Sequence, residues 1–80
     1  MIAIHPGCTI RDELTERGWT QLDLAAVTGR SAEHLNRIIN GKAGISVDMA
    51  TRLGAAFGTS AEFWLRLWGA YRLVKLEEMT

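Results

Sequence analysis

Residues 20–42 read "TQLDLAAVTGRSAEHLNRIINGK" and contain the start and stop signals of two short helices. Thr20 is followed three residues later by Asp23, the spacing of a capping box at a helix N-terminus. Ser31 is a second residue of the type that caps helix N-termini. Gly29 can adopt the positive φ that most residues resist, which permits a sharp turn. The stretch therefore predicts two helices separated by a tight turn.

The apolar residues of these two helices fit a helix-turn-helix unit. Four of them are spaced to meet in the angle between the helices: Leu24, Ala25, Leu35 and Ile38. Val27 is also expected to be buried. In such a unit the second helix enters the major groove of DNA with its N-terminus first. A helical hairpin with no role in DNA binding could share this pattern, so the apolar spacing alone leaves both interpretations open.

Helix signals recur outside this stretch, and no segment alternates long enough to predict a strand. Further helices are expected from about Gly7 to Arg17, from Ser46 to the residue before Gly58, and from near Ser60 to about Glu77. In the second of these, four residues are expected to point inward: Val47, Ala50, Leu53 and Phe57. The 80 residues are therefore predicted to form one compact all-α domain of five helices, spanning 1–80, with the last helix as a dimerisation element.

Charge and cysteine content narrow the class of protein. Nine Lys and Arg balance nine Asp and Glu, which argues against strong non-specific binding to polyanions. Locally, however, residues 29–42 carry three basic residues against Glu33 alone. The single Cys8 predicts a reducing, cytoplasmic setting. The start lacks the features of a signal peptide, and no apolar run is long enough to span a bilayer, so no membrane association is expected.

Enzymatic chemistry finds no support in the sequence. There is no Gly-rich phosphate loop and no nucleophile elbow. His5 and Cys8 form a lone H-x-x-C without the second ligand pair that a metal site needs. We therefore expect no catalytic residues, no metal and no cofactor, and we expect Cys8 to be a small apolar filler.

The polar residues of the second helix are candidates for DNA contact. Arg37 could reach a guanine edge or a phosphate, and Lys42 suits a phosphate because Lys acts as a point charge. Asn40 could contact a phosphate or close the helix in a left-handed conformation. Glu33 could accept a hydrogen bond from cytosine, although an acidic residue in a first turn more often complements the helix dipole. His34 is a possible donor to a base or a phosphate.

Further sequence blocks in a fixed order give the chain a specific resemblance. "HPG" near the start, "INGK" followed by "GIS", and "LGAAFGTSAEFWL" resemble blocks of the HigA antitoxins, within the xenobiotic-response-element (XRE) class of helix-turn-helix proteins. The resemblance covers residues 5–73. It implies a lambda-repressor-like fold and a homodimer that binds a palindromic operator in double-stranded DNA. It also implies repression of its own operon and neutralisation of a HigB-type mRNA-cleaving toxin.

The helix-turn-helix pattern and the resemblance together give the candidate site residues. The base-reading candidates are Ala32, Glu33, His34 and Arg37. The candidates for contacts with the DNA backbone are Thr20, Gln21, Arg30, Ser31, Asn36, Asn40 and Lys42. Ala32 stands where many relatives carry a long polar residue, and Arg30 stands where a small apolar residue is usual. These two departures concern the base contacts and not the fold.

The last predicted helix carries more apolar surface than one core needs. Its core-facing candidates are Phe63, Leu67 and Ala70. A second face is formed by Trp64, Trp68 and Tyr71, at i, i+4 and i+7. Trp and Tyr are favoured at interfaces, and a two-fold dimer is the commonest assembly, so these three are predicted at a dimer interface. The alternative is that all three aromatic side chains pack inside the domain.

Two other functions remain open from the sequence. Zero net charge and the second apolar face also suit a protein-interaction module that binds a toxin or another partner without DNA recognition. The chain could also be the N-terminal regulatory domain of a longer protein.

Overall fold

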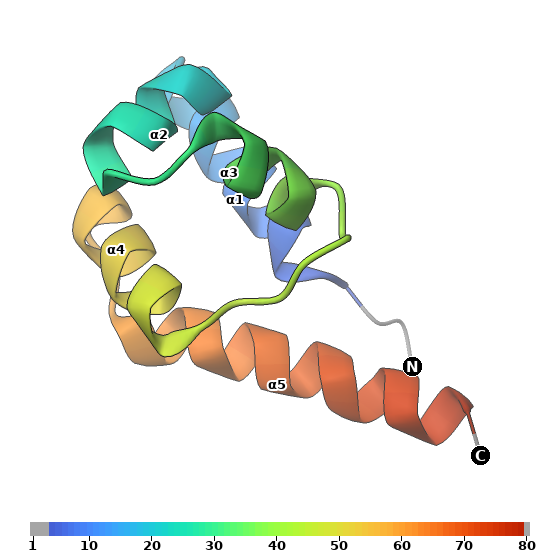
Figure 1. Ribbon diagram of the computed structural model, residues 1–80. Helices are drawn as coiled ribbons and strands as arrows, with labels where there is room; N and C mark the ends of the chain where they lie inside the picture. The colour runs from blue at the N-terminus through green and yellow to red at the C-terminus, as the bar shows by residue number, and fades with distance from the viewer. Residues whose placement is uncertain (1–3, 80) are drawn as a thin grey trace.

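The computed structural model describes residues 4–79 and contains five α-helices, as predicted. The helices are α1 (Pro6–Arg17), α2 (Gln21–Thr28), α3 (Ala32–Ile39), α4 (Val47–Phe57) and α5 (Ala61–Glu78). α3 packs against α1 and α2, while α4 packs against α2 and α5. In Figure 1, α5 runs beneath the other helices, and its C-terminal part extends past them. None of the described helices has the length and apolarity that a bilayer crossing requires.

Side-chain caps begin α2 and α3 where the sequence predicts them. Thr20 Oγ1 accepts from the Asp23 backbone N–H at 3.1 Å, and Asp23 Oδ2 accepts from the Thr20 N–H at 2.8 Å. Ser31 caps α3 by accepting from the backbone N–H of His34 at 3.1 Å. Gly29 ends α2 with φ 71°, the left-handed conformation that the tight turn requires. The predicted helix-turn-helix unit is therefore present.

The core lies where the five helices meet. Eight of its side chains have 2% or less of their surface exposed: Ile10, Leu24, Leu35, Ile38, Met49, Ala50, Leu53 and Trp64. One burial prediction in α2 and one in α4 were wrong, because Val27 is 53% exposed and Val47 is 68% exposed. At the C-terminal end of α2, Thr28 is buried in place of Val27, and its hydroxyl donates to the Leu24 carbonyl at 2.7 Å. That hydrogen bond satisfies a polar group that would otherwise be costly to bury.

The face of α5 that meets the core is the one predicted for a dimer interface. Trp64 is fully buried beside Phe57, and its indole N–H donates to Thr59 Oγ1 at 2.8 Å. Phe63 and Ala70, predicted to face the core, are exposed. Trp64 is drawn inward because the indole buries a large apolar area and finds a partner for its N–H. The prediction that Trp64 contributes to an interface between copies was therefore wrong.

Trp68 and Tyr71 continue the inward face of α5 and are half-buried. Their rings pack against the imidazole of His5, with centroid separations of 5.4 and 4.8 Å. His5 caps α1, where its Nδ1 accepts from the Gly7 N–H at 2.9 Å. Cys8, predicted to fill space in the core, is exposed. α5 is thus joined to the start of α1 by an aromatic cluster.

Candidate nucleic-acid interface

α3 buries one side and presents the other to solvent. Its buried residues are Leu35, Ile38 and Ile39, and its exposed residues are Glu33, His34, Asn36, Arg37 and Asn40. At 3.6 residues per turn, Glu33, Arg37 and Asn40 follow the middle of the exposed side. Asn36 lies on the flank toward α2, and His34 lies on the flank toward α4. Ala32, the first residue of the helix, is half-buried and offers only a methyl group.

Four of the predicted contact residues have side chains without a hydrogen bond or ion pair to any residue in 4–79: Glu33, His34, Arg37 and Lys42. Glu33 and Arg37 are one turn apart on α3, yet they form no ion pair. An Arg side chain carries five hydrogen-bond donors. Because the donors of Arg37 bind only solvent within the described structure, all of them are available to a partner molecule. The exposed side of α3 is therefore an uncommitted polar surface.

A chain of side-chain hydrogen bonds runs along the α2 flank of this surface. Arg11 Nη2 on α1 donates to Asn40 Oδ1 at 3.2 Å, and Asn40 Nδ2 donates to Asn36 Oδ1 at 3.1 Å. Asn36 Nδ2 in turn donates to Gln21 Oε1 at 3.0 Å. Three predicted backbone-contact residues are thus brought together. Arg11 was missed, because it lies 29 positions from Asn40 and no local sequence pattern connects the two.

Asn40, at the end of α3, does not adopt the left-handed conformation that was one of its two predicted roles. Asn40 has φ −88° and ψ 10°, so it is not left-handed. Gly41 takes that conformation, with φ 75°. The side chain of Asn40 is consequently held in the hydrogen-bond chain and does not serve as a left-handed helix cap.

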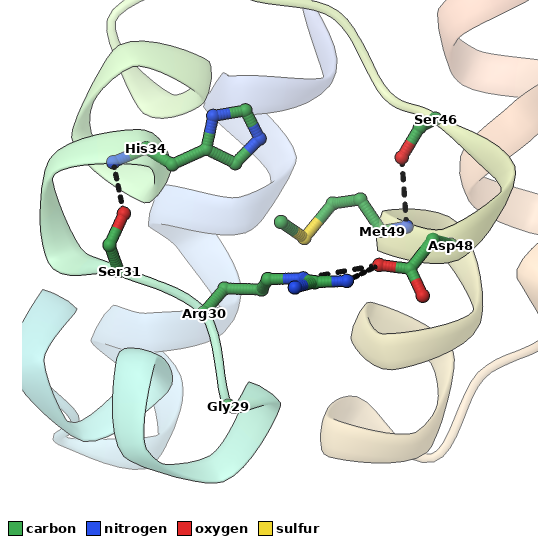
Figure 2. Close-up of a pocket in the computed structure, with 7 residues that line it drawn as sticks. All are labelled: Gly29, Arg30, Ser31, His34, Ser46, Asp48 and Met49. Carbon is green, nitrogen blue, oxygen red and sulfur yellow. Dashed lines mark hydrogen bonds and ion pairs between the residues drawn. The ribbon is translucent and has the colours of Figure 1, made fainter.

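On the opposite flank, an acidic side chain of α4 holds Arg30. Figure 2 shows the Arg30 guanidinium directed at Asp48, with which it forms an ion pair. Arg52 also binds Asp48, through Nε at 2.9 Å, and its Nη1 donates to the Thr28 carbonyl at the end of α2 at 2.6 Å. Hydrogen bonds from Arg30 and Arg52 lower the pKa of the Asp48 carboxyl. Arg30, predicted to contact the DNA backbone, is therefore directed toward α4 in the free protein.

A polar groove of about 470 Å³ separates this flank of α3 from the start of α4. Its lining residues are Gly29, Arg30, Ser31, His34, Ser46, Asp48 and Met49. Figure 2 shows the His34 ring and the Arg30–Asp48 pair on its walls. The capping residues Ser31 and Ser46 place the N-termini of α3 and α4 beside the groove, and helix N-termini favour anions. Thr20 and Ser31 have their hydroxyl oxygens engaged as caps, which leaves each hydroxyl hydrogen available as a donor.

Comparison with known proteins identifies the family to which this geometry belongs. The helix-turn-helix family matches residues 10–64. Virulence-associated protein A' of Dichelobacter nodosus is 40% identical over 75 residues, which cover 92% of this chain and 65% of that protein. The chain thus spans just under two thirds of the length of that relative.

Solved structures give the same result at higher coverage. The Pseudomonas aeruginosa antitoxin HigA with higBA promoter superposes with a TM-score of 0.93 at 42% identity, covering 98% of this chain and 86% of that chain. A HigA-family addiction module antidote protein from Coxiella burnetii superposes with a TM-score of 0.87 at 36% identity, covering 91% of this chain and 80% of that chain. Proteins of this family are DNA-binding regulators and not enzymes. The chain therefore belongs to the XRE-type helix-turn-helix family and, within it, to the HigA antitoxins.

Proposed function

We propose that the protein is a cytoplasmic, sequence-specific DNA-binding antitoxin that represses its own operon as a homodimer on a palindromic operator. The observation that carries this proposal is the uncommitted polar side of α3, which lies in a helix-turn-helix frame. The HigA relative from Pseudomonas aeruginosa was solved with its promoter, which supports the same role for this chain. Arg37, His34 and Glu33 face base edges, while Gln21, Asn40 and Lys42 contact the backbone.

The DNA proposal is tested by binding to a duplex that spans the region upstream of the reading frame. Arg37→Ala is expected to weaken binding about 10-fold or more and to relax sequence preference, because Arg contacts to guanine discriminate between bases. Lys42→Ala is expected to weaken binding to all sequences alike and to reduce the salt slope by about one. Arg66→Ala, on the exposed side of α5, is the matched control. Binding that does not change with salt at any sequence contradicts the proposal.

The homodimer forms through the exposed apolar residues of α5. At 3.6 residues per turn, one stripe of α5 contains Phe63, Leu67, Ala70 and Val74. The stripe is continuous over three turns and lies about 100° around the helix from the inward face of Trp64, Trp68 and Tyr71. Phe63 and Ala70 are exposed, whereas Leu67 and Val74 are half-buried and Leu67 packs against the edge of the core. Leu73 and Leu76, near the C-terminal end of α5 but on another side of the helix, are 57% and 60% exposed. A second copy related by a two-fold axis would cover this surface with the same stripe.

The partner protein is a HigB-type mRNA-cleaving toxin, which the chain neutralises by binding. Membership of the HigA antitoxins supports this assignment. The product of the neighbouring reading frame, purified with this protein, is expected to form a stable complex and to lose mRNA cleavage activity in it. An active RNase that keeps its full activity in the presence of excess antitoxin would contradict the assignment.

A protein-interaction module without DNA recognition is the second candidate function. The exposed apolar side chains along α5 favour it, and Met79, at 83% exposed, extends them to the end of the described chain. This candidate predicts that Arg37→Ala and Lys42→Ala leave repression and partner binding unchanged. The proposed function predicts loss of repression with intact partner binding.

A further inference from the structure

Arg11 determines the direction of the hydrogen-bond chain along α3. A guanidinium has donors only, so Asn40 turns its carbonyl oxygen toward Arg11 and its amide nitrogen toward Asn36. The same constraint passes to Asn36, which accepts from Asn40 and donates to Gln21. A primary amide standing alone could present either its oxygen or its nitrogen. Arg11 therefore fixes which atom each of three amides turns outward.

The far end of the chain is a hydrogen-bond donor at a helix N-terminus. Gln21 is the first residue of α2, and its Oε1 accepts from Asn36, which leaves the two Nε2 hydrogens without a partner among residues 4–79. The N-terminus of a helix carries partial positive charge and unpaired backbone donors. A phosphate oxygen placed there would be met by the Gln21 amide nitrogen, and not by its oxygen.

We propose that Arg11 is a positioning residue of the DNA interface, which acts through Asn40 and Asn36 to hold Gln21 Nε2 toward a phosphate of the DNA backbone. This inference rests on the proposed function. It extends the interface to α1, which residues 20–42 do not include. The bond from Arg11 is charge-assisted and the next three groups are aligned head to tail, so each donor strengthens the next.

A double-mutant cycle on the full chain tests the inference, with the upstream duplex as the probe. Arg11→Met and Gln21→Ala are each expected to weaken binding about 3- to 10-fold, the range for loss of one hydrogen bond. The double variant is expected to bind no more weakly than the weaker single variant, because both changes remove the same contact. Arg11→Lys, which keeps a donor-only head group, is expected to retain most of the affinity.

A second measurement detects the hydrogen-bond chain in the absence of DNA. In the free protein, Arg11→Met is expected to shift the side-chain amide ¹H–¹⁵N resonances of Asn40, Asn36 and Gln21. Arg66→Met is the matched control, because Arg66 pairs with Glu62 on α5 and with no other residue in 4–79. This variant is expected to change neither measurement.

The outcomes separate this inference from the proposed function. Unchanged binding by Arg11→Met overturns the inference. Additive losses in the cycle also overturn it, since Arg11 would then contact DNA independently of Gln21. In both cases wild-type binding to the duplex would leave the proposed function standing. A wild-type protein that shows no salt-dependent binding overturns both.

Discussion

The imidazole of His5 meets the ring of Tyr71 edge to face, with centroids 4.8 Å apart. This contact joins the N-terminal cap of α1 to the middle of α5. His5 Nδ1 accepts from the Gly7 N–H, so the ring is neutral and its proton resides on Nε2, which is buried and has no hydrogen-bond partner in residues 4–79. Burial lowers the pKa of His5 from 6.5, and the backbone of Ala43 offsets part of this shift.

The His5 cap predicts a loss of stability on acidification. The folded state binds the His5 proton less readily than the unfolded chain does, so the free energy of unfolding should fall as the pH drops below 6.5. The fall should end once the pH passes the lowered pKa of the folded state. Urea unfolding at pH 7.5, 6.5 and 5.5 measures it. His5→Asn keeps a capping acceptor without titrating, so its stability should change less over this range, and an equal change in both proteins would refute the assignment.

Two glycines in helices predict opposite responses to alanine. A Cβ on Gly7 would lie 2.4 Å from the Ile38 carbonyl oxygen, which is backbone and cannot move aside cheaply, so Gly7→Ala should destabilise the fold by roughly 2 kcal/mol or more. A Cβ on Gly69 meets nothing within 4 Å, so Gly69→Ala should stabilise α5 by about 0.5–1 kcal/mol. Thermal melts of both variants at low protein concentration provide the comparison. A Gly7→Ala variant as stable as the wild type would show that α1 does not lie against α3 this closely.

Removal of the Asp48 carboxylate is expected to strengthen DNA binding. Asp48→Asn takes a negative charge away from the groove and releases Arg30 from its ion pair. We expect affinity for the upstream duplex to rise several-fold and the salt slope to steepen by about one, because one more cation becomes available to phosphate. Glu62→Gln, which breaks a comparable exposed ion pair on α5, should leave both quantities unchanged. Weaker binding by Asp48→Asn would mean that the Arg30–Asp48 pair itself is part of the DNA-bound state.

The proposed dimer surface on α5 predicts that one added charge separates the copies. Ala70→Glu places a carboxylate at the middle of the exposed apolar stripe, where it would be buried without a partner in the dimer. Sedimentation velocity should show a monomer with unchanged helical circular dichroism. Ala55→Glu, at an exposed alanine of α4, should remain dimeric. A dimeric Ala70→Glu variant would exclude this stripe as the interface.

The helix-turn-helix unit was predictable because its signals are local. Thr20 and Asp23 form their capping box within one turn, and Gly29 needs only its own positive φ. The inward face of α5 was not predictable in the same way. That helix is apolar on most sides, so periodicity cannot distinguish the face that meets the core from the face that remains exposed.

In the candidate DNA interface, only the features that depend on residues close together in the sequence were predictable. The free side chains of Arg37 and Lys42 follow from their places in and after α3. The Arg11–Asn40 and Arg30–Asp48 contacts join different helices, and they depend on how those helices pack. Within α2, the burial of Thr28 in place of Val27 was equally unpredictable from the sequence. The polar Thr28 can be buried because its hydroxyl donates to the Leu24 carbonyl.

Two arginines from outside the α2–α3 unit hold it at two points, the turn between the helices and the end of α3. Arg11 binds Asn40 where α3 finishes, and Arg52 binds the Thr28 carbonyl where α2 finishes. The conformational entropy of this unit is therefore lost when the protein folds and not when it meets its partner. In the proposed complex the protein surface is already rigid, so the DNA duplex is the partner that changes shape. Operators whose sequence bends at low energetic cost are then preferred, including at base pairs that no side chain touches.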